Sequence, residues 1–192
     1  MTGVLPRSFY ARDALVVAPE LLGKVLAHGA CRGRIVEVEA YREDDPASHS
    51  HRGPTARNAT MFGGPGRLYV YFTYGMHHCA NVVTGTAGDG QAVLLRAVVP
   101  LAGLDVMRER RGPERADRHL ADGPGKLAQA FALDRALDGC DLTRGPVRLL
   151  SDGLAPPPQP LITTRIGITR AVDWAWRFVD PRPRSACQHG RS

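Results

Sequence analysis

Short runs in which apolar and polar residues alternate dominate the chain, and this period of two is typical of half-buried β-strands. Helical signals are fewer, and the clearest is Pro124 just inside the start of an apolar-periodic segment. The expected strands are residues 24–28, 34–41, 67–73, 77–84, 91–99, 147–150 and 161–169. The expected helices are residues 17–22, 102–111 and 124–133. Strands cluster without helices regularly between them, so we expect a mixed α+β fold: one compact domain with a curved, largely antiparallel sheet, flanking helices and a protruding β-hairpin.

The connections between these segments are rich in Pro, Gly, Ser and Asn. Residues 44–66 are expected to form a long loop, and residues 155–160 a proline-rich connector. The chain has 192 residues, close to the usual size of one domain. We therefore expect a single domain over residues 1–179, followed by a poorly ordered tail over residues 180–192.

Composition excludes collagen-like, coiled-coil and wholly disordered proteins, since 43% of the residues are hydrophobic and 23% are charged. The formal charge of +6 suits a polyanionic partner without requiring one. The cysteines (Cys31, Cys79, Cys140 and Cys187) are scattered, which fits neither a zinc ribbon nor a small disulfide scaffold. We see no secretory signal and no membrane-spanning stretch, and so expect a reduced, cytoplasmic protein.

One expected strand places two carboxylates and a phenol on a single face. Alternation puts Ile35, Glu37, Glu39 and Tyr41 on one side and Val36, Val38 and Ala40 on the other. Carboxylates at this spacing lie about 6.5 Å apart, near enough for one to affect the other's pKa where water is scarce. The alternative is a solvated face neutralised by Arg32 or Arg34, and the pattern alone favours that alternative.

A second segment combines aromatic residues with an unusual turn. Leu68, Val70 and Phe72 are expected to face the core, with Tyr69, Tyr71 and Thr73 on the opposite side. The turn that follows carries Tyr74 and Met76, where polar residues are usual, and this favours insertion into a partner such as duplex DNA. The alternative is a turn that folds back over the core.

Several polar residues elsewhere are candidates for the same site. His49 lies in a polar loop and follows Tyr41 closely enough to return to it. Arg96 interrupts an apolar strand and needs a partner, for which Glu39 is the natural candidate. Lys126 opens a helix, where free N–H groups and a cation favour a phosphate. His77 and His78 point to opposite faces of a strand, so no metal site is expected there.

Taken in their order, these segments resemble the alkyladenine (3-methyladenine) DNA glycosylase family. The resemblance covers nearly the whole chain, from about Phe9 to Phe178. It is carried by residues 34–41 (RIVEVEAY), His49-Ser50, residues 55–58 (TARN) with Met61-Phe62, residues 66–71 (GRLYVY), 74–76 (YGM), Asn81, 88–90 (GDG), 93–96 (VLLR) and 123–127 (GPGKL).

The resemblance implies a monomeric, cofactor-independent enzyme that flips a damaged purine out of duplex DNA and hydrolyses its N-glycosidic bond with water. Glu39 would activate the water and Arg96 would help to hold it. The remaining roles it implies are a sandwich around the flipped base (Tyr41, His49, Tyr71), discrimination against the 2-amino group of guanine (Asn81), filling of the gap in the duplex (Tyr74, with Met76 beside it) and contact with DNA phosphates (Arg57, Lys126).

Two other functions stay open on the sequence alone. One is a different N-glycoside or sugar hydrolase that uses Glu37 and Glu39 as an acid/base pair, although this leaves Tyr74 and Met76 unexplained. The other is a non-catalytic binder of damaged DNA. It is suggested by the C-terminus, where residues 180–184 replace the Ser-Pro-containing segment that usually follows the last strand in the family.

Overall fold

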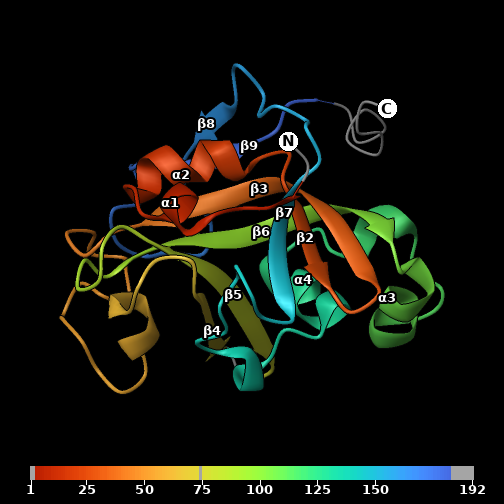
Figure 1. Ribbon diagram of the computed structural model, residues 1–192, viewed down its shortest axis with the longest axis horizontal. Coiled ribbons are helices and arrows are strands. Elements are labelled where there is room, and N and C mark those ends of the chain that lie inside the picture. The colour runs from red at the N-terminus through yellow and green to blue at the C-terminus, as the bar shows by residue number, and fades with distance from the viewer. Residues whose placement is uncertain (1–2, 74, 183–192) are drawn as a thin grey trace.

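The computed structural model describes residues 3–73 and 75–182, and within them nine strands form one antiparallel sheet (Figure 1). The strands are β1 (Gly3–Val4), β2 (Val25–His28), β3 (Cys31–Tyr41), β4 (Leu68–Thr73), β5 (His77–Thr84), β6 (Gln91–Ala102), β7 (Val147–Ser151), β8 (Leu161–Thr163) and β9 (Arg177–Val179). The α-helices are α1 (Arg7–Tyr10), α2 (Ala14–Leu21), α3 (Leu104–Arg111) and α4 (Pro124–Phe131). Three 3₁₀ turns are η1 (Ala59–Phe62), η2 (Asp117–His119) and η3 (Arg135–Leu137). The mixed α+β class expected from the sequence is confirmed.

The sheet branches at β3. Its strands run in the order β1-β7-β2-β3-β6-β5-β4, and β3 pairs with β6 along one edge. Along its other edge β3 pairs first with β2 and then, at residues 37–39, with β9, which in turn pairs with β8. The middle of β3 is therefore held on both edges, and this is the part of the chain that carries the two glutamates.

Irregular pairing between β3 and β6 changes the faces expected from alternation. Ile35 pairs with Val98, but Glu37 pairs with Ala97, so β3 has one extra residue at this point. Ile35 consequently lies in the main core, away from the face of Glu37 on which the sequence pattern placed it. The expectation for Ile35 was wrong because a β-bulge shifts the period of two by one residue.

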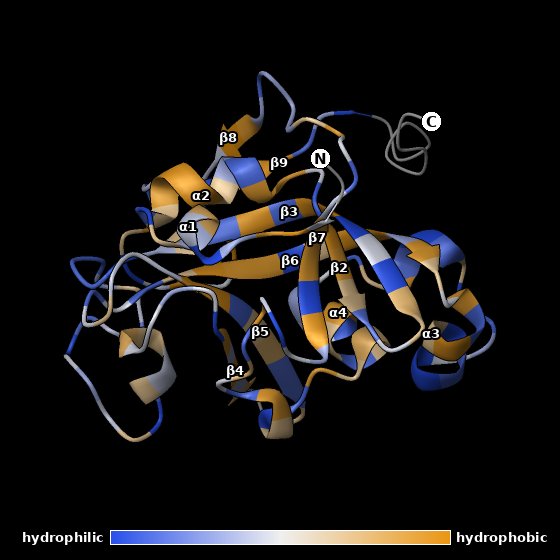
Figure 2. Cartoon of the chain, viewed as in Figure 1, coloured by the Kyte–Doolittle hydropathy of each residue, from blue (hydrophilic) through white to orange (hydrophobic). Residues whose placement is uncertain are grey.

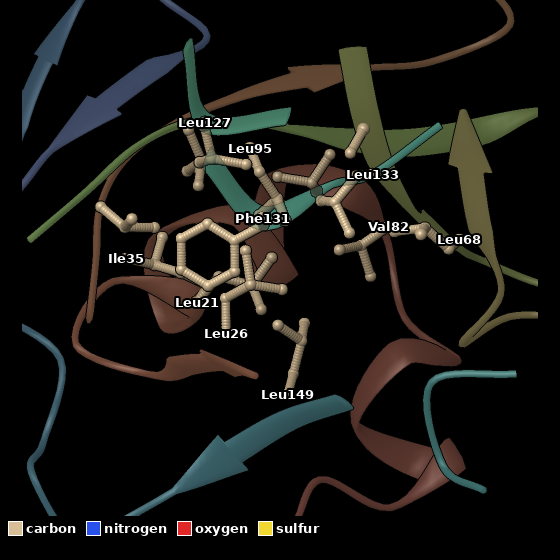
Figure 3. Close-up of a cluster of buried hydrophobic side chains, with 14 of the residues drawn as sticks. Leu21, Leu26, Ile35, Leu68, Val82, Leu95, Leu127, Phe131, Leu133 and Leu149 are labelled. Carbon is tan, nitrogen blue, oxygen red and sulfur yellow. The ribbon is translucent and has the colours of Figure 1, made fainter. Parts of the chain in front are cut away.

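The core lies where α2 and α4 pack against the curved sheet. Figure 3 shows Phe131 of α4 among leucines and isoleucine from α2, β2, β3 and β7, and all of these side chains are buried. Burial of each Leu or Phe stabilises the fold by about 1.5–3 kcal/mol. In Figure 2 the strands that face this core are predominantly hydrophobic, whereas α3 is largely hydrophilic.

Most expected elements are present, with shifted ends. The first expected helix begins at Ala14 rather than residue 17, because Asp13 accepts a hydrogen bond from Leu15 N at 2.8 Å and caps it. The expected strand at residues 161–169 ends at Thr163, and the residues after it turn toward the sheet. Phe72 was expected in the core but is 46% exposed near the end of the β4–β5 hairpin.

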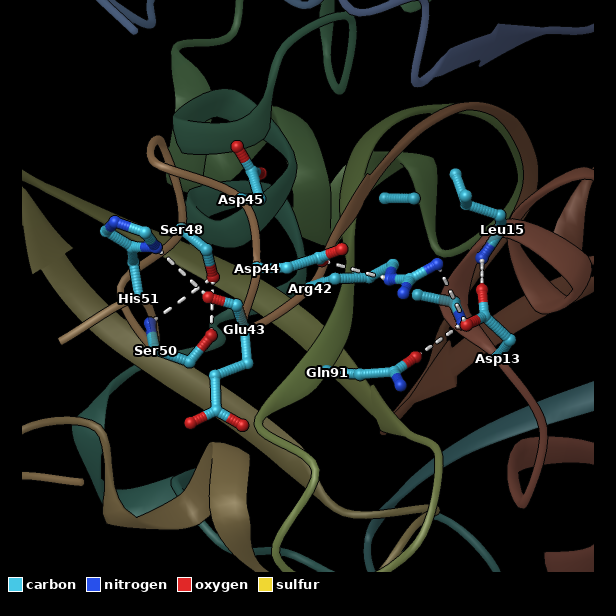
Figure 4. A network of polar contacts seen from close by, with 12 residues as sticks. Asp13, Leu15, Arg42, Glu43, Asp44, Asp45, Ser48, Ser50, His51 and Gln91 are labelled. Atoms are coloured by element: carbon cyan, nitrogen blue, oxygen red, sulfur yellow. Dashed lines mark hydrogen bonds and ion pairs between the residues drawn. The ribbon is translucent and has the colours of Figure 1, made fainter. Parts of the chain in front are cut away.

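The chain after β3 is anchored by a polar network (Figure 4). Arg42 lies between Asp13 and Asp44 and pairs with them at 3.4 and 3.1 Å. Further along, the Ser48 and Ser50 hydroxyls lie 2.7 Å apart. The segment from Arg42 to Ser50, which carries His49, therefore has polar contacts at its start and around His49, although the sequence predicts an open loop here.

Directly after β9 the chain is still hydrogen-bonded to β3. Asp180 is buried, and its N–H donates to the carbonyl of Val36 at 2.9 Å. No helix among residues 3–73 and 75–182 has the length and apolar character needed to cross a bilayer.

Candidate active site

Glu39 is a fully buried carboxylate held by three donors. Its Oε1 accepts from the Ile166 N–H at 2.8 Å and lies 3.1 Å from Nη1 of Arg96. Its Oε2 accepts from the Tyr41 hydroxyl at 2.9 Å. A carboxylate offers about four acceptor positions, so one position on Oε2 stays available for another donor.

Arg96 joins the two glutamates of β3. Its Nε donates to Glu37 Oε1 at 2.7 Å, and Nε of Arg177 reaches the same oxygen at 2.7 Å. Burial alone would lower the pKa of Arg96, but Glu39 and Glu37 raise it above its usual value. The sequence predicted the Arg96–Glu39 pair and missed the bridge to Glu37 and the second cation, Arg177.

Glu37 is held as a charged carboxylate. Burial raises the pKa of Glu37, but the hydrogen bonds from Arg177 and Arg96 outweigh it and keep this pKa below its ordinary value. Arg32 and Arg34 play no part in this, since Arg34 pairs with Asp152 at 2.7 Å and Arg32 donates to the carbonyls of Gly29 and Cys31.

An aromatic cavity of about 510 Å³ lies directly over this cluster. The structure brings Tyr41, His49, Tyr71 and Asn81 together around it, as the sequence predicted, with Arg96 at its floor. Glu39 does not line the cavity, because Tyr41, Arg96 and Ile166 stand between its carboxylate and the opening. The site is therefore a pocket for a planar group, with a sealed carboxylate behind its floor.

His49 lies edge to face with both Tyr69 and Tyr71 in the cavity lining, and the Tyr69 and Tyr71 rings are tilted by 31° to each other. The His49 and Tyr71 rings lie 4.4 Å apart at 74°, too close for a base to fit between these two. A planar ligand therefore has to lie against them rather than between them. Nδ1 of His49 is 3.1 Å from the Tyr69 hydroxyl, a contact that sequence reasoning missed because Tyr69 was simply grouped with Tyr71.

Burial keeps the groups of this wall uncharged. It lowers the pKa of His49, with the nearby Arg57 guanidinium acting in the same direction. It also raises the pKa of Tyr69 to about 12 and the pKa of Tyr41 well above its usual value. Tyr69 keeps its proton, so its hydroxyl and the neutral His49 ring share one hydrogen bond, in which the tautomer of His49 decides which partner donates.

Asn81 is buried and lines the cavity. Its Nδ2 donates to the carbonyl of Tyr69 at 3.1 Å, and its amide oxygen can act as an acceptor. The thiol of Cys79 lies beside it and beside Tyr71, and burial raises the pKa of that thiol. The sequence does not predict Cys79 as a pocket residue, because the preceding His77 and His78 raise only the question of a metal site.

Residues 166–170 form a further part of the cavity lining. They follow β8, and all of them line the cavity, whereas the sequence pattern placed residues 161–169 in a strand. The preceding Arg165 is fully buried against Asp45, and its guanidinium lies 4.7 Å from the centroid of the Tyr41 ring. The sequence does contain one signal for this segment: Arg165 and Arg170 interrupt an otherwise largely apolar stretch, which is unusual for a buried strand.

Three arginines border a second cavity of about 350 Å³ that adjoins the first. They are Arg52, Arg57 and Arg170, and along residues 3–73 and 75–182 no carboxylate lies within ion-pair distance of them. Arg57 was expected here. Lys126, by contrast, pairs with Asp122 at 2.8 Å, so its charge is partly neutralised.

The turn between β4 and β5 exposes its apolar residue. Met76 is 70% exposed, so this side chain does not fold back over the core. Tyr74 lies outside the described residues, and its predicted role is neither supported nor opposed by the structure. In the part of the chain that is described, no group of three His, Cys, Asp or Glu side chains could hold a metal ion.

The fold and the site together define an α+β protein with an aromatic pocket over a buried, arginine-bound carboxylate. The family model for methylpurine-DNA glycosylase matches residues 8–184. The relatives found by sequence comparison include several that bear the name "Putative 3-methyladenine DNA glycosylase". One from Methanoculleus marisnigri is 51% identical over 91% of this chain and 93% of its own. One from Burkholderia lata is 52% identical (94% and 89%), and one from Carboxydothermus hydrogenoformans is 48% identical (91% and 94%). This chain belongs to the methylpurine-DNA glycosylase family.

Proposed function

We propose that this protein is a monofunctional DNA glycosylase that acts on alkylated or deaminated purines of the 3-methyladenine kind. It would flip the damaged nucleotide out of the duplex, hydrolyse the N-glycosidic bond with an activated water and leave an abasic site. Family membership supports the class of reaction. The observation that carries the mechanism is Glu39, a buried carboxylate with one acceptor position left beside an aromatic cavity.

The cavity suits a flipped purine. An alkylated purine carries positive charge and stacks favourably on the electron-rich rings of Tyr41 and Tyr71. The wall of His49 and Tyr69 is neutral and does not repel that charge. The oxygen of Asn81 accepts hydrogen bonds, and at this position we infer discrimination against the 2-amino group of guanine from the family resemblance.

Glu39 would act as the general base. The bound nucleotide has to displace the cover that Tyr41, Arg96 and Ile166 form over Glu39, so that a water beside Arg96 can donate one hydrogen to the open position on Oε2. The water oxygen forms the bond to C1′ of the sugar as the bond from C1′ to the purine breaks. The electrons of the broken bond neutralise an alkylated, cationic base, whereas a neutral deaminated purine leaves as an anion and takes a proton from solvent; in both cases Glu39 takes the water proton. Until then its negative charge stabilises the positive charge that develops on the sugar.

DNA would bind across the second cavity and the hairpin. Arg57 and its neighbours Arg52 and Arg170 have no carboxylate partner in the described residues, so phosphates are their natural counter-ions. Met76 stands exposed at the turn beside Tyr74, where an apolar wedge could enter the space left by the flipped base. Lys126 would contribute less than these arginines, because Asp122 already pairs with it.

The geometry disfavours a hydrolase that uses Glu37 and Glu39 as an acid/base pair. A general acid must hold a proton, but Arg96 and Arg177 keep Glu37 charged. Both carboxylates also lie on the same strand, whereas glycosidase carboxylates flank the substrate.

Release of free base from methylated duplex DNA tests this proposal. Glu39→Gln should keep lesion binding and lower single-turnover excision by about 10² or more, the scale of a lost general base. Glu37→Gln is the matched control on the same strand, and its loss should be far smaller. Wild-type protein that binds the lesion duplex and releases no base would instead make it a non-catalytic binder of damaged DNA.

A further inference from the structure

Arg165 lies behind the pocket and is not part of its lining. Its guanidinium forms a bidentate pair with Asp45, and both side chains are completely buried. Nη1 also donates to the carbonyl of Ala40 at 3.1 Å. The guanidinium stacks 4.7 Å from the Tyr41 ring and 5.2 Å from the Trp176 ring.

These contacts connect two segments that line the cavity. Asp45 comes directly before residues 46–49 and Arg165 comes directly before residues 166–170, and both segments belong to the cavity lining. One buried ion pair therefore sets the distance between two loops that are about 120 residues apart in the chain.

The same side chain controls what surrounds Glu39. Ala40, whose carbonyl it binds, lies between Glu39 and Tyr41 in β3. Ile166, the residue after Arg165, donates its N–H to Glu39 Oε1. The ring stacked on the Arg165 guanidinium is that of Tyr41, whose hydroxyl donates to Glu39 Oε2. Two of the three donors to Glu39 are thus positioned through Arg165.

We propose that Arg165 is a positioning residue for base excision, which holds Tyr41 and the Ile166 N–H on the Glu39 carboxylate and keeps the two lining segments, residues 46–49 and 166–170, in place relative to each other. This inference rests on the proposed glycosylase function. Arginine is required at this position, because a planar guanidinium can bind a carboxylate through two parallel hydrogen bonds and stack on an aromatic face at the same time. A lysine retains the charge but provides neither feature.

The test compares Arg165→Lys with Arg34→Lys. Arg34 is also a buried arginine in a bidentate pair, with Asp152, but it lies away from the cavity.

Single-turnover release of base from methylated duplex is measured together with Tm and with affinity for a duplex that carries a tetrahydrofuran abasic analogue. Arg165→Lys should slow excision about 10-fold, on the scale of a small misplacement of reacting groups. Its Tm loss should match that of Arg34→Lys, and its affinity for the analogue should stay within about twofold of wild type.

An excision rate for Arg165→Lys equal to that of Arg34→Lys would overturn the proposal. So would an Arg165→Lys variant whose excision rate and DNA affinity fall by the same factor. Should Arg165→Lys fail to fold, the double variant Asp45→Asn/Arg165→Gln removes both buried charges together, and its excision rate decides in the same way. Wild-type protein without base release would refute the glycosylase function itself, which is a different result from an active wild type with an unaffected Arg165 variant.

Discussion

The hydroxyl of Tyr41 donates to Oε2 of Glu39 at 2.9 Å, and the ring of the same residue lines the cavity. Burial, followed by the charge of Glu39, raises the pKa of Tyr41, so the phenol keeps its proton and serves as a donor. Tyr41 thus has two separable features: a ring surface for a ligand and a hydrogen bond that orients the carboxylate.

Tyr41→Phe separates these two features. The ring remains, so affinity for a lesion duplex should stay close to wild type, whereas excision should fall about 10-fold because a hydrogen bond to a charged group contributes about 1.5–3 kcal/mol. Single-turnover rates and lesion affinities check this. Tyr10→Phe is the matched control, since Tyr10 is also buried and its hydroxyl has no partner among the described residues. Loss of affinity without loss of rate would refute the orienting role.

That Glu39 and Tyr41 share a face and that Arg96 needs a partner could be predicted from local pattern, although the same pattern favoured a solvated face rather than the fully buried Glu39 of the structure. A strand puts every second side chain on one face, and a charge within an apolar strand has to find a partner. The neighbouring antiparallel strand supplies that partner, since Glu39 pairs in register with Leu94. These relationships require only strand periodicity and the cost of an unpaired buried charge.

Other parts of the site depend on contacts between distant segments, and alternation does not contain them. The bulge at Val36 moves Ile35 into the core, and no residue type in β3 announces it. Residues 164–169 were expected to continue the strand, but β8 ends at Thr163, Arg165 pairs with the distant Asp45, and the residues that follow line the cavity. Phe72 reads as core, but the hairpin extends beyond the elements that would cover it.

The apolar turn should matter most where base pairs have to be opened. Tyr74→Ser and Met76→Ser should each lower excision from duplex DNA more than excision from single strands, since flipping from a duplex costs a few kcal/mol. Rates on the two substrates check this. Leu161→Ser, a change at an exposed apolar residue of β8, is the control and should affect neither. Equal losses on both substrates would contradict a wedge at this turn.

His49 should make stability depend on pH. Burial first, and the charge of Arg57 second, lower its pKa in the folded protein below the ordinary value of about 6.5. Below that pH the unfolded chain binds a proton at His49 that the folded chain does not, so the free energy of unfolding falls as pH falls. Above it, His49 is neutral in both states and the contribution is fully present.

Urea unfolding at pH values from about 7.5 to 5 measures this effect against His49→Gln, whose curve should be flatter below about 6.5. Arg57→Ala should raise the pKa of His49, as followed by NMR of its ring protons, because it removes the nearby positive charge. Identical pH slopes for wild type and His49→Gln would show that His49 titrates in the folded state as it does in the unfolded chain.

The lysines predict which type of glycosylase this is. Enzymes that also cut the strand form a Schiff base between an amine and the sugar, for which a lysine with a lowered pKa is well suited. The sequence has only Lys24 and Lys126. Burial lowers the pKa of Lys24, but Lys24 does not line the cavity. Lys126 is bound to Asp122 at 2.8 Å.

Borohydride should therefore trap no covalent adduct with a methylated duplex, and the product should be an intact strand with an abasic site. A strong trapped band that persists in Lys24→Ala and disappears in Lys126→Ala would move the nucleophile from water to Lys126 and remove Glu39 from its role as the base.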